Sequence, residues 1–183
     1  MDGTECLNAT FKMLAHANEW ANKRLYEAVA KLSDVDYRTN RGAFFGSMHG
    51  TLNHLLVADR IWMHRFTGKG DCPTQLNAIL FDDFKALRAA REAEDIRIVN
   101  YIERLTPAEL SSKITFMTVS NPRRITQRLA PALSHFFNHQ THHRGQAHCL
   151  LTMMTGDAPS FDLMQYQREV EDKDPVLETG PDG

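Results

Sequence analysis

Four long stretches of this chain carry apolar residues at three- and four-residue steps, and this periodicity limits the possible folds most. Such spacing gathers apolar side chains on one face of an α-helix. We predict long helices over residues 6–32, 47–68, 82–105 and 131–156. Ser47 and Gly68 are typical residues for the start and the end of the second helix. Helices of this kind bury their apolar faces best in a bundle, so we predict an all-α four-helix bundle.

Two short segments before the last predicted helix have a different character. Residues 114–119 and 124–129 contain Ile, Thr, Phe and Val, and Asn121-Pro122 between them is a turn signal. They predict a small β-hairpin. Pro131 is expected at the start of the helix that follows, since proline suits the first helical position.

The length of 183 residues fits one domain with its own core. We place this domain at residues 1–165 and expect an acidic C-terminal tail over residues 166–183. No stretch approaches the roughly 20 apolar residues of a membrane span, and the amino terminus lacks the pattern of a secretory signal. We therefore expect a cytoplasmic protein with no membrane partner.

The charge and the cysteines exclude further classes of function. A formal net charge of −2 gives no basic excess, so we expect no nucleic-acid partner. The three cysteines are scattered without a C-x-x-C pair, which fits a reducing compartment and argues against a thiolate zinc site. Any metal site must therefore use histidines.

Histidines are concentrated in one segment of the last predicted helix. Five of the nine lie within residues 134–148. In a helix, His135, His139 and His143 share one face because they follow one another at steps of four residues. Two histidines spaced in this way can chelate one divalent ion. His142 points roughly 100° away and is expected at the surface.

A metal site inside a bundle needs a further ligand from another helix. His54 lies in the middle of the second predicted helix beside Leu55 and is best placed to point inward. Asp59, five residues later, lies about 140° around the same helix, so we expect it to orient another group or to face a partner.

Two longer motifs carry a family resemblance. They are GSMHGTLNHLLVADRIWMHRFTG at residues 46–68 and LSHFFNHQTHHRGQ at residues 133–146, and NEWANKRL at residues 18–25 supports them. Together these segments resemble the DinB (damage-inducible) family and its thiol-transferase-like relatives, over roughly residues 8–165.

The resemblance implies a bundle with up-down-down-up helix order, usually a homodimer, with a divalent metal held by three histidines. By position in the motifs these are His54, His139 and His143. The family metal implied is nickel or zinc. The activity implied is transfer or isomerisation of a small molecule with a low-molecular-weight thiol.

The residues leave several alternatives open. A three-histidine site leaves a position free that can activate a thiol or a water molecule, so a metal-dependent hydrolase remains an alternative, as does a non-catalytic metal-binding stress-response scaffold or sensor. No catalytic residue follows from spacing. We expect His135 to be a neighbour of the site rather than a ligand, and metal loading to fall below about pH 6.

Other residues in and near these motifs are expected to have roles outside the metal site. Arg144 and Gln146 are expected to serve packing or an interface first and function second, and Gly145 is expected to permit close approach of another helix. Three arginines flank the predicted hairpin: Arg123, Arg124 and Arg128. We expect them to form a basic edge in contact with solvent. The alternative hypothesis is that one of them attracts an anionic substrate.

Overall fold

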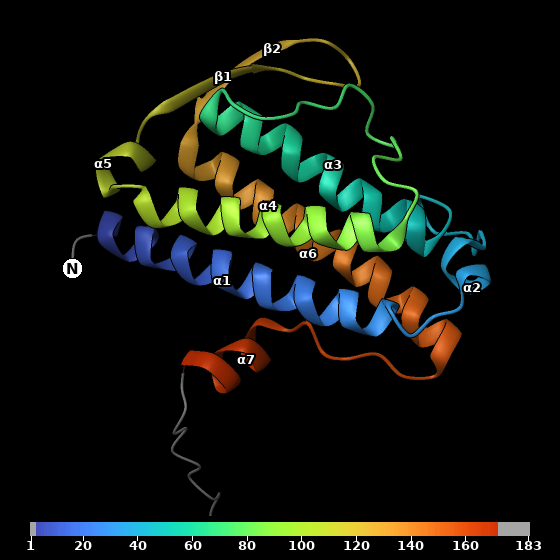
Figure 1. The fold of residues 1–183 in the computed structure, drawn as a ribbon. Helices are drawn as coiled ribbons and strands as arrows, with labels where there is room; N and C mark the ends of the chain where they lie inside the picture. Colours follow the sequence, from blue (N-terminus) through green and yellow to red (C-terminus); the bar gives the residue numbers. More distant parts are fainter. Residues whose placement is uncertain (1–2, 172–183) are drawn as a thin grey trace, which may run out of the picture.

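Four long helices form the bundle in the computed structural model, which describes residues 3–171 (Figure 1). They are α1 (Gly3–Val29), α3 (Met48–Thr67), α4 (Phe84–Arg104) and α6 (Leu129–Thr155). Helices α3 and α4 run in the same direction, opposite to α1 and α6, because the loop between them crosses the length of the bundle (Figure 1). The predicted all-α bundle with up-down-down-up order is therefore confirmed.

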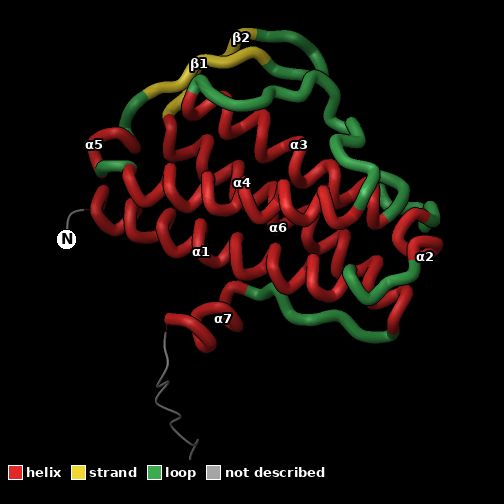
Figure 2. Tube along the Cα trace, viewed as in Figure 1, coloured by secondary structure: helices red, strands yellow, loops and turns green. Residues whose placement is uncertain are grey.

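Short elements surround the bundle. The helical ones are α2 (Asp34–Arg38), α5 (Pro107–Leu110), α7 (Leu163–Tyr166) and the π-helical turn η1 (Gln167–Glu171). The predicted hairpin is confirmed as β1 (Lys113–Met117) and β2 (Arg124–Arg128), an antiparallel pair with Thr115 opposite Thr126. It lies across the end of the bundle where α3 ends and α6 begins (Figure 2).

The helix ends largely follow the local signals. The Ser47 hydroxyl accepts a hydrogen bond from the Gly50 amide at 3.1 Å, and Gly68 ends α3 in the left-handed conformation with φ 67°. The start of α6 differs from the prediction, since this helix begins at Leu129 rather than at Pro131. Proline is tolerated there because amide groups in the first turn have no partner within the helix.

The core is aromatic at one end of the bundle and mainly aliphatic at the other. Trp62, Phe136 and Phe137 are buried at the aromatic end, as their apolar spacing indicates. Among the described residues, no helix is long and apolar enough to cross a membrane.

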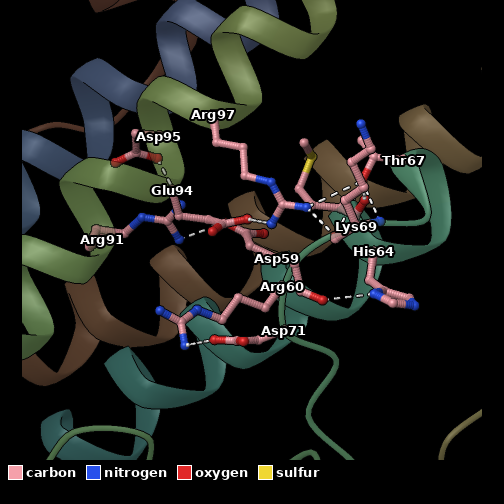
Figure 3. A network of polar contacts seen from close by, with 12 residues as sticks. Asp59, Arg60, His64, Thr67, Lys69, Asp71, Arg91, Glu94, Asp95 and Arg97 are labelled. Atoms are coloured by element: carbon pink, nitrogen blue, oxygen red, sulfur yellow. Dashed lines mark hydrogen bonds and ion pairs between the residues drawn. The ribbon is translucent and has the colours of Figure 1, made fainter.

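A set of buried charged and amide side chains crosses the middle of the bundle. Arg91 of α4 is 1% exposed, donates to Asp59 of α3 at 2.6 Å and lies 3.0 Å from Asp95 (Figure 3). Hydrogen bonds from side chains of α1 and α6 extend this set. We call it the ionic network: Asn18, Asn22, Asp59, Arg91, Asp95, Gln140 and Arg144.

Two predictions about residues near the motifs are decided by this arrangement. For Asp59 the structure selects one of the two predicted roles: it is fully buried and accepts hydrogen bonds from Arg91 and Gln140, so it orients other groups within the chain and does not face a partner. Gly145 is exposed, and a Cβ atom there would meet nothing within 4 Å, so this glycine permits no close helix approach.

The first part of the expected tail packs against α1. Tyr166 is buried and makes an edge contact with Trp20 at 5.8 Å, and Glu169 pairs with Arg24 at 3.0 Å. The rest of the expected tail, residues 172–183, lies outside the described residues.

Candidate metal centre

Three histidines from two neighbouring helices meet inside the bundle. His54 comes from α3, and His139 and His143 come from α6 one turn apart. One ring nitrogen of each lies within 4.8 Å of those of the other two. The structure thus brings together the three residues that the sequence motifs select, and we call them the histidine cluster.

Hydrogen bonds fix the tautomer of two of these rings. The Nδ1 atom of His54 lies 2.7 Å from the carbonyl oxygen of Leu76, and Nδ1 of His143 lies 2.8 Å from Oε1 of Gln146. Both partners are acceptors, so each Nδ1 carries a proton and donates it. The Nε2 atom of each neutral ring then holds a lone pair.

These two lone pairs face one another. The Nε2 atoms of His54 and His143 are 3.2 Å apart, with no proton to share between them. Two nitrogen ligands bound tetrahedrally at about 2.0–2.1 Å from one zinc ion would be roughly 3.3 Å apart. The third ring adds a further unsatisfied atom, since Nδ1 of His139 is buried and has no hydrogen-bond partner among the described residues. The donor set therefore fits a divalent metal ion.

Burial keeps these imidazoles neutral. Burial, with a smaller contribution from the neighbouring histidine rings, lowers the pKa of His54 from 6.5 to about 4 and that of His139 from 6.5 to about 3. Burial also lowers the pKa of His143. Because neutral imidazole is the form that binds metals, the lowered pKa values favour metal binding at a lower pH than the sequence alone predicts.

The surrounding side chains cover one side of the cluster. The ring of Phe45 stacks on His54 with 3.7 Å between centroids and meets His143 at 5.4 Å. Its loop lies directly against α3, because a Cβ atom on Gly50 would stand 2.1 Å from the Phe45 carbonyl oxygen. Close backbone approach therefore occurs at Gly50, one turn before His54.

A cavity of about 390 Å³ opens on the other side, beside His139. It lies between α3, α6 and the turn of the hairpin. Its wall includes apolar side chains, two arginines, and the polar residues of the turn: Ala58, Ile61, Trp62, Arg65, Leu76, Thr118, Val119, Ser120, Asn121, Arg123, His135 and His139. A small molecule in this space would contact the histidine cluster.

The remaining candidate residues lie outside the cluster. His135 is exposed, rests against Trp62 at 5.1 Å, and has its ring 5.8 Å from that of His139. It does not join the group of converging nitrogens. His142 is exposed, as predicted from its helical phase.

Comparison with known proteins agrees with these motifs. The sequence model of the DinB family matches residues 7–174, a range that contains the histidine cluster and all but the first residues of the bundle. The chain belongs to the DinB family. It is similar to Protein DinB of Bacillus subtilis (strain 168), with 27% identity over 150 residues that cover 77% of this chain and 83% of that protein. No solved structure matches the chain.

Three partners of the histidine cluster in this DinB-family protein were missed by the sequence motifs. Gln146 was interpreted first as a packing or interface group, but it accepts a hydrogen bond from His143. Leu76 acts through its carbonyl group, so its side chain gives no signal. Phe45 had a weak signal, since glycines with positive φ stand on both sides at residues 42 and 46 and permit its tight loop.

The loop that carries Leu76 is itself held in place. Asn53, beside His54 in the sequence, is fully buried and accepts hydrogen bonds from the amides of Leu80 and Phe81 at 2.9 and 3.0 Å. Its own amide group donates to the Phe81 carbonyl at 3.1 Å. Asn53 therefore fixes the long loop that carries Leu76, and the Leu76 carbonyl group in turn orients His54.

Proposed function

We propose that this DinB-family protein binds one divalent metal ion through His54, His139 and His143. We further propose that it is a metal-dependent enzyme of the thiol S-transferase or isomerase type that acts on a small molecule. The observation that carries the proposal is the pair of Nε2 lone pairs 3.2 Å apart, which His54 and His143 direct at a common point. Imidazole ligands suit zinc and nickel, and these are the ions we propose.

An open site supports an enzyme over a scaffold. Three neutral ligands are the set found in catalytic zinc sites, where a fourth position remains available. The cavity of about 390 Å³ beside His139 gives a small molecule access to that position. A bound divalent ion would supply Lewis acidity and would favour the thiolate form of a thiol, which is the nucleophilic form.

The protein's own residues contribute orientation and shielding. Leu76 and Gln146 hold two imidazoles with their lone pairs aimed inward. Phe45 covers His54 and keeps water from that side of the cluster. The cytoplasmic location and the homodimer remain part of the proposal, supported by the scattered cysteines and by the family resemblance respectively.

A conjugation assay tests the thiol transfer. The zinc- or nickel-loaded protein is mixed with cysteamine and a chloronitrobenzene; the thiolate sulfur forms a bond to the ring carbon, chloride leaves, and the thiol proton goes to buffer. We expect the wild type to accelerate this reaction at least about tenfold over His139→Ala, and His142→Ala to keep the activity. Equal rates for wild type and His139→Ala would contradict thiol transfer, and thiol-independent turnover of an ester would favour the hydrolase.

A further inference from the structure

The cavity beside the histidine cluster carries positive charge without a compensating acid. Arg65 from α3 and Arg123 from the end of the hairpin turn both line it, whereas no aspartate or glutamate does. Neither arginine forms an ion pair with a carboxylate of the described residues. The cavity is therefore chemically suited to an anion.

Arg65 is held firmly by neutral groups. Its guanidinium lies 4.5 Å from the Trp62 ring centre and 4.3 Å from that of Phe116, and Nη2 donates to the Met117 carbonyl at 3.1 Å. A guanidinium has five N–H donors, so this single bond leaves most of them available. By contrast, Arg60 on the same helix is neutralised by Asp71 at 3.0 Å (Figure 3).

The hairpin turn positions Arg123. Its backbone amide donates to the Thr118 hydroxyl at 2.9 Å, and its carbonyl accepts from the Thr118 amide at 3.0 Å. These two bonds close the turn and place residue 123 at the cavity wall. Arg124 and Arg128 do not line the cavity, so the structure selects one of the three arginines considered from the sequence.

The rest of the wall is suited to an apolar body. Ala58, Ile61, Trp62 and Leu76 contribute aliphatic and aromatic surface between the arginines and the histidines. A volume of about 390 Å³ is near the lower end of the range for small-molecule sites, roughly 300–1,000 Å³. A ring or a short chain with one anionic end fills such a space.

We propose that Arg65 and Arg123 form a carboxylate-binding subsite, and that the reaction takes a small carboxylate with an apolar body whose other end reaches the histidine cluster. Planar guanidinium groups match the two oxygens of a carboxylate. That the other end of the substrate reacts at the histidine cluster rests on the proposed function. The binding of a carboxylate by the two arginines does not. The carboxylate belongs either to the thiol or to the molecule that accepts it.

Binding of benzoate and of benzamide, its neutral counterpart of nearly the same shape, tests the subsite. Titration calorimetry on the full chain loaded with zinc should show benzoate bound at least about tenfold more tightly than benzamide. Arg65→Gln and Arg123→Gln should each remove most of this preference. Arg124→Gln, the matched control one residue away, should keep it.

Equal affinity for benzoate and benzamide would overturn the subsite, as would a preference that survives in Arg123→Gln. Arg123 is exposed, so its substitution leaves the fold intact even if Arg65→Gln disturbs packing on Trp62. His54→Ala separates the two proposals, because it should lose the metal and keep the preference for benzoate, since His54 does not line the cavity. A wild type that takes up no metal but still prefers benzoate would refute the metal site alone, and a metal-loaded wild type without the preference would refute the subsite alone.

Competition then identifies the source of the carboxylate. L-cysteine carries a carboxylate and cysteamine lacks it, but both carry the same thiol. Displacement of benzoate by L-cysteine alone supports the subsite and assigns the carboxylate to the thiol. Benzoate that stays bound in the presence of both thiols supports the subsite and assigns the carboxylate to the acceptor.

Discussion

The ionic network and the histidine cluster are both groups of polar side chains inside the bundle, and both include residues of α3 and α6, but they differ in how their atoms are satisfied. In the network, Arg91 stands between Asp59 and Asp95, so opposite charges compensate within the protein. In the cluster, neutral rings turn lone pairs toward one another and no carboxylate joins them. His139 and Gln140 are adjacent in the sequence, yet each belongs to a different group.

This difference separates a structural role from a functional one. A buried ion pair is costly when one partner is removed, because the other charge is left without compensation. The lone pairs that converge in the histidine cluster repel one another, and a metal cation from outside the chain would stabilise them. Stability measurements should therefore respond mainly to the network, and metal measurements mainly to the cluster.

Removal of Arg91 should give the largest effect on stability. At pH 8, Arg91→Ala leaves two buried carboxylates without their cation and should lower the free energy of unfolding by about 3–5 kcal/mol. Urea denaturation followed by circular dichroism measures this change. Arg88→Ala, which removes an exposed pair with Glu92 on the same helix, should cost less than about 1 kcal/mol. Similar losses for both variants would contradict a structural role of the network.

Removal of the Gln146 side chain should weaken the metal site without weakening the fold. Gln146→Ala leaves His143 free to rotate, and loss of such a partner typically lowers metal affinity about 10- to 100-fold. Competition with a chromophoric chelator measures the affinity. Gln167→Ala is the control, since that amide contacts Met13 far from the cluster. Unchanged zinc affinity in Gln146→Ala would show that the hydrogen bond does not orient the ring.

The two regions should respond to pH in opposite directions. The pKa of His54 is lowered to about 4 by burial, so between pH 6.5 and 4 the unfolded chain binds a proton that the folded chain excludes. This contribution to stability is present at higher pH and is lost as pH falls. Burial raises the pKa of Asp59 to about 7 against the opposing effect of Arg91, so its contribution is present at low pH and is lost as pH rises toward 7.

A single variant isolates the histidine effect. Without metal, the wild type should lose about 1.5 kcal/mol more stability than His54→Gln when the pH falls from 6.5 to 5. Urea midpoints at the two pH values give this difference. Parallel pH profiles for the two proteins would mean that His54 takes up a proton as readily in the folded chain as in the unfolded one.

Local signals predicted the long helices well because periodicity and caps act within a few residues. Ser47 and Gly68 bound α3, and the four-residue spacing of His139 and His143 places both on one face of α6. The start of α6 was placed two residues late because proline is equally acceptable deeper in the first turn.

Contacts between distant segments could not be predicted in the same way. In the sequence Arg91 resembles the other arginines of α4, and only the packing of four helices shows that it is fully buried. The backbone carbonyl of Leu76 gives no pattern at all. Arg123 was one of three similar arginines until the closure of the hairpin turn placed it at the cavity.

The metal content of protein purified without an affinity tag or chelator tests the central claim most directly. The measurement compares the wild type with His54→Ala, His139→Ala and His143→Ala, and with His142→Ala as the exposed control on α6. We predict about one divalent ion per chain in the wild type and in His142→Ala, and almost none in the three cluster variants. A wild type that holds no metal and takes up neither zinc nor nickel would contradict the account, as would a site emptied by His142→Ala and left filled by His143→Ala.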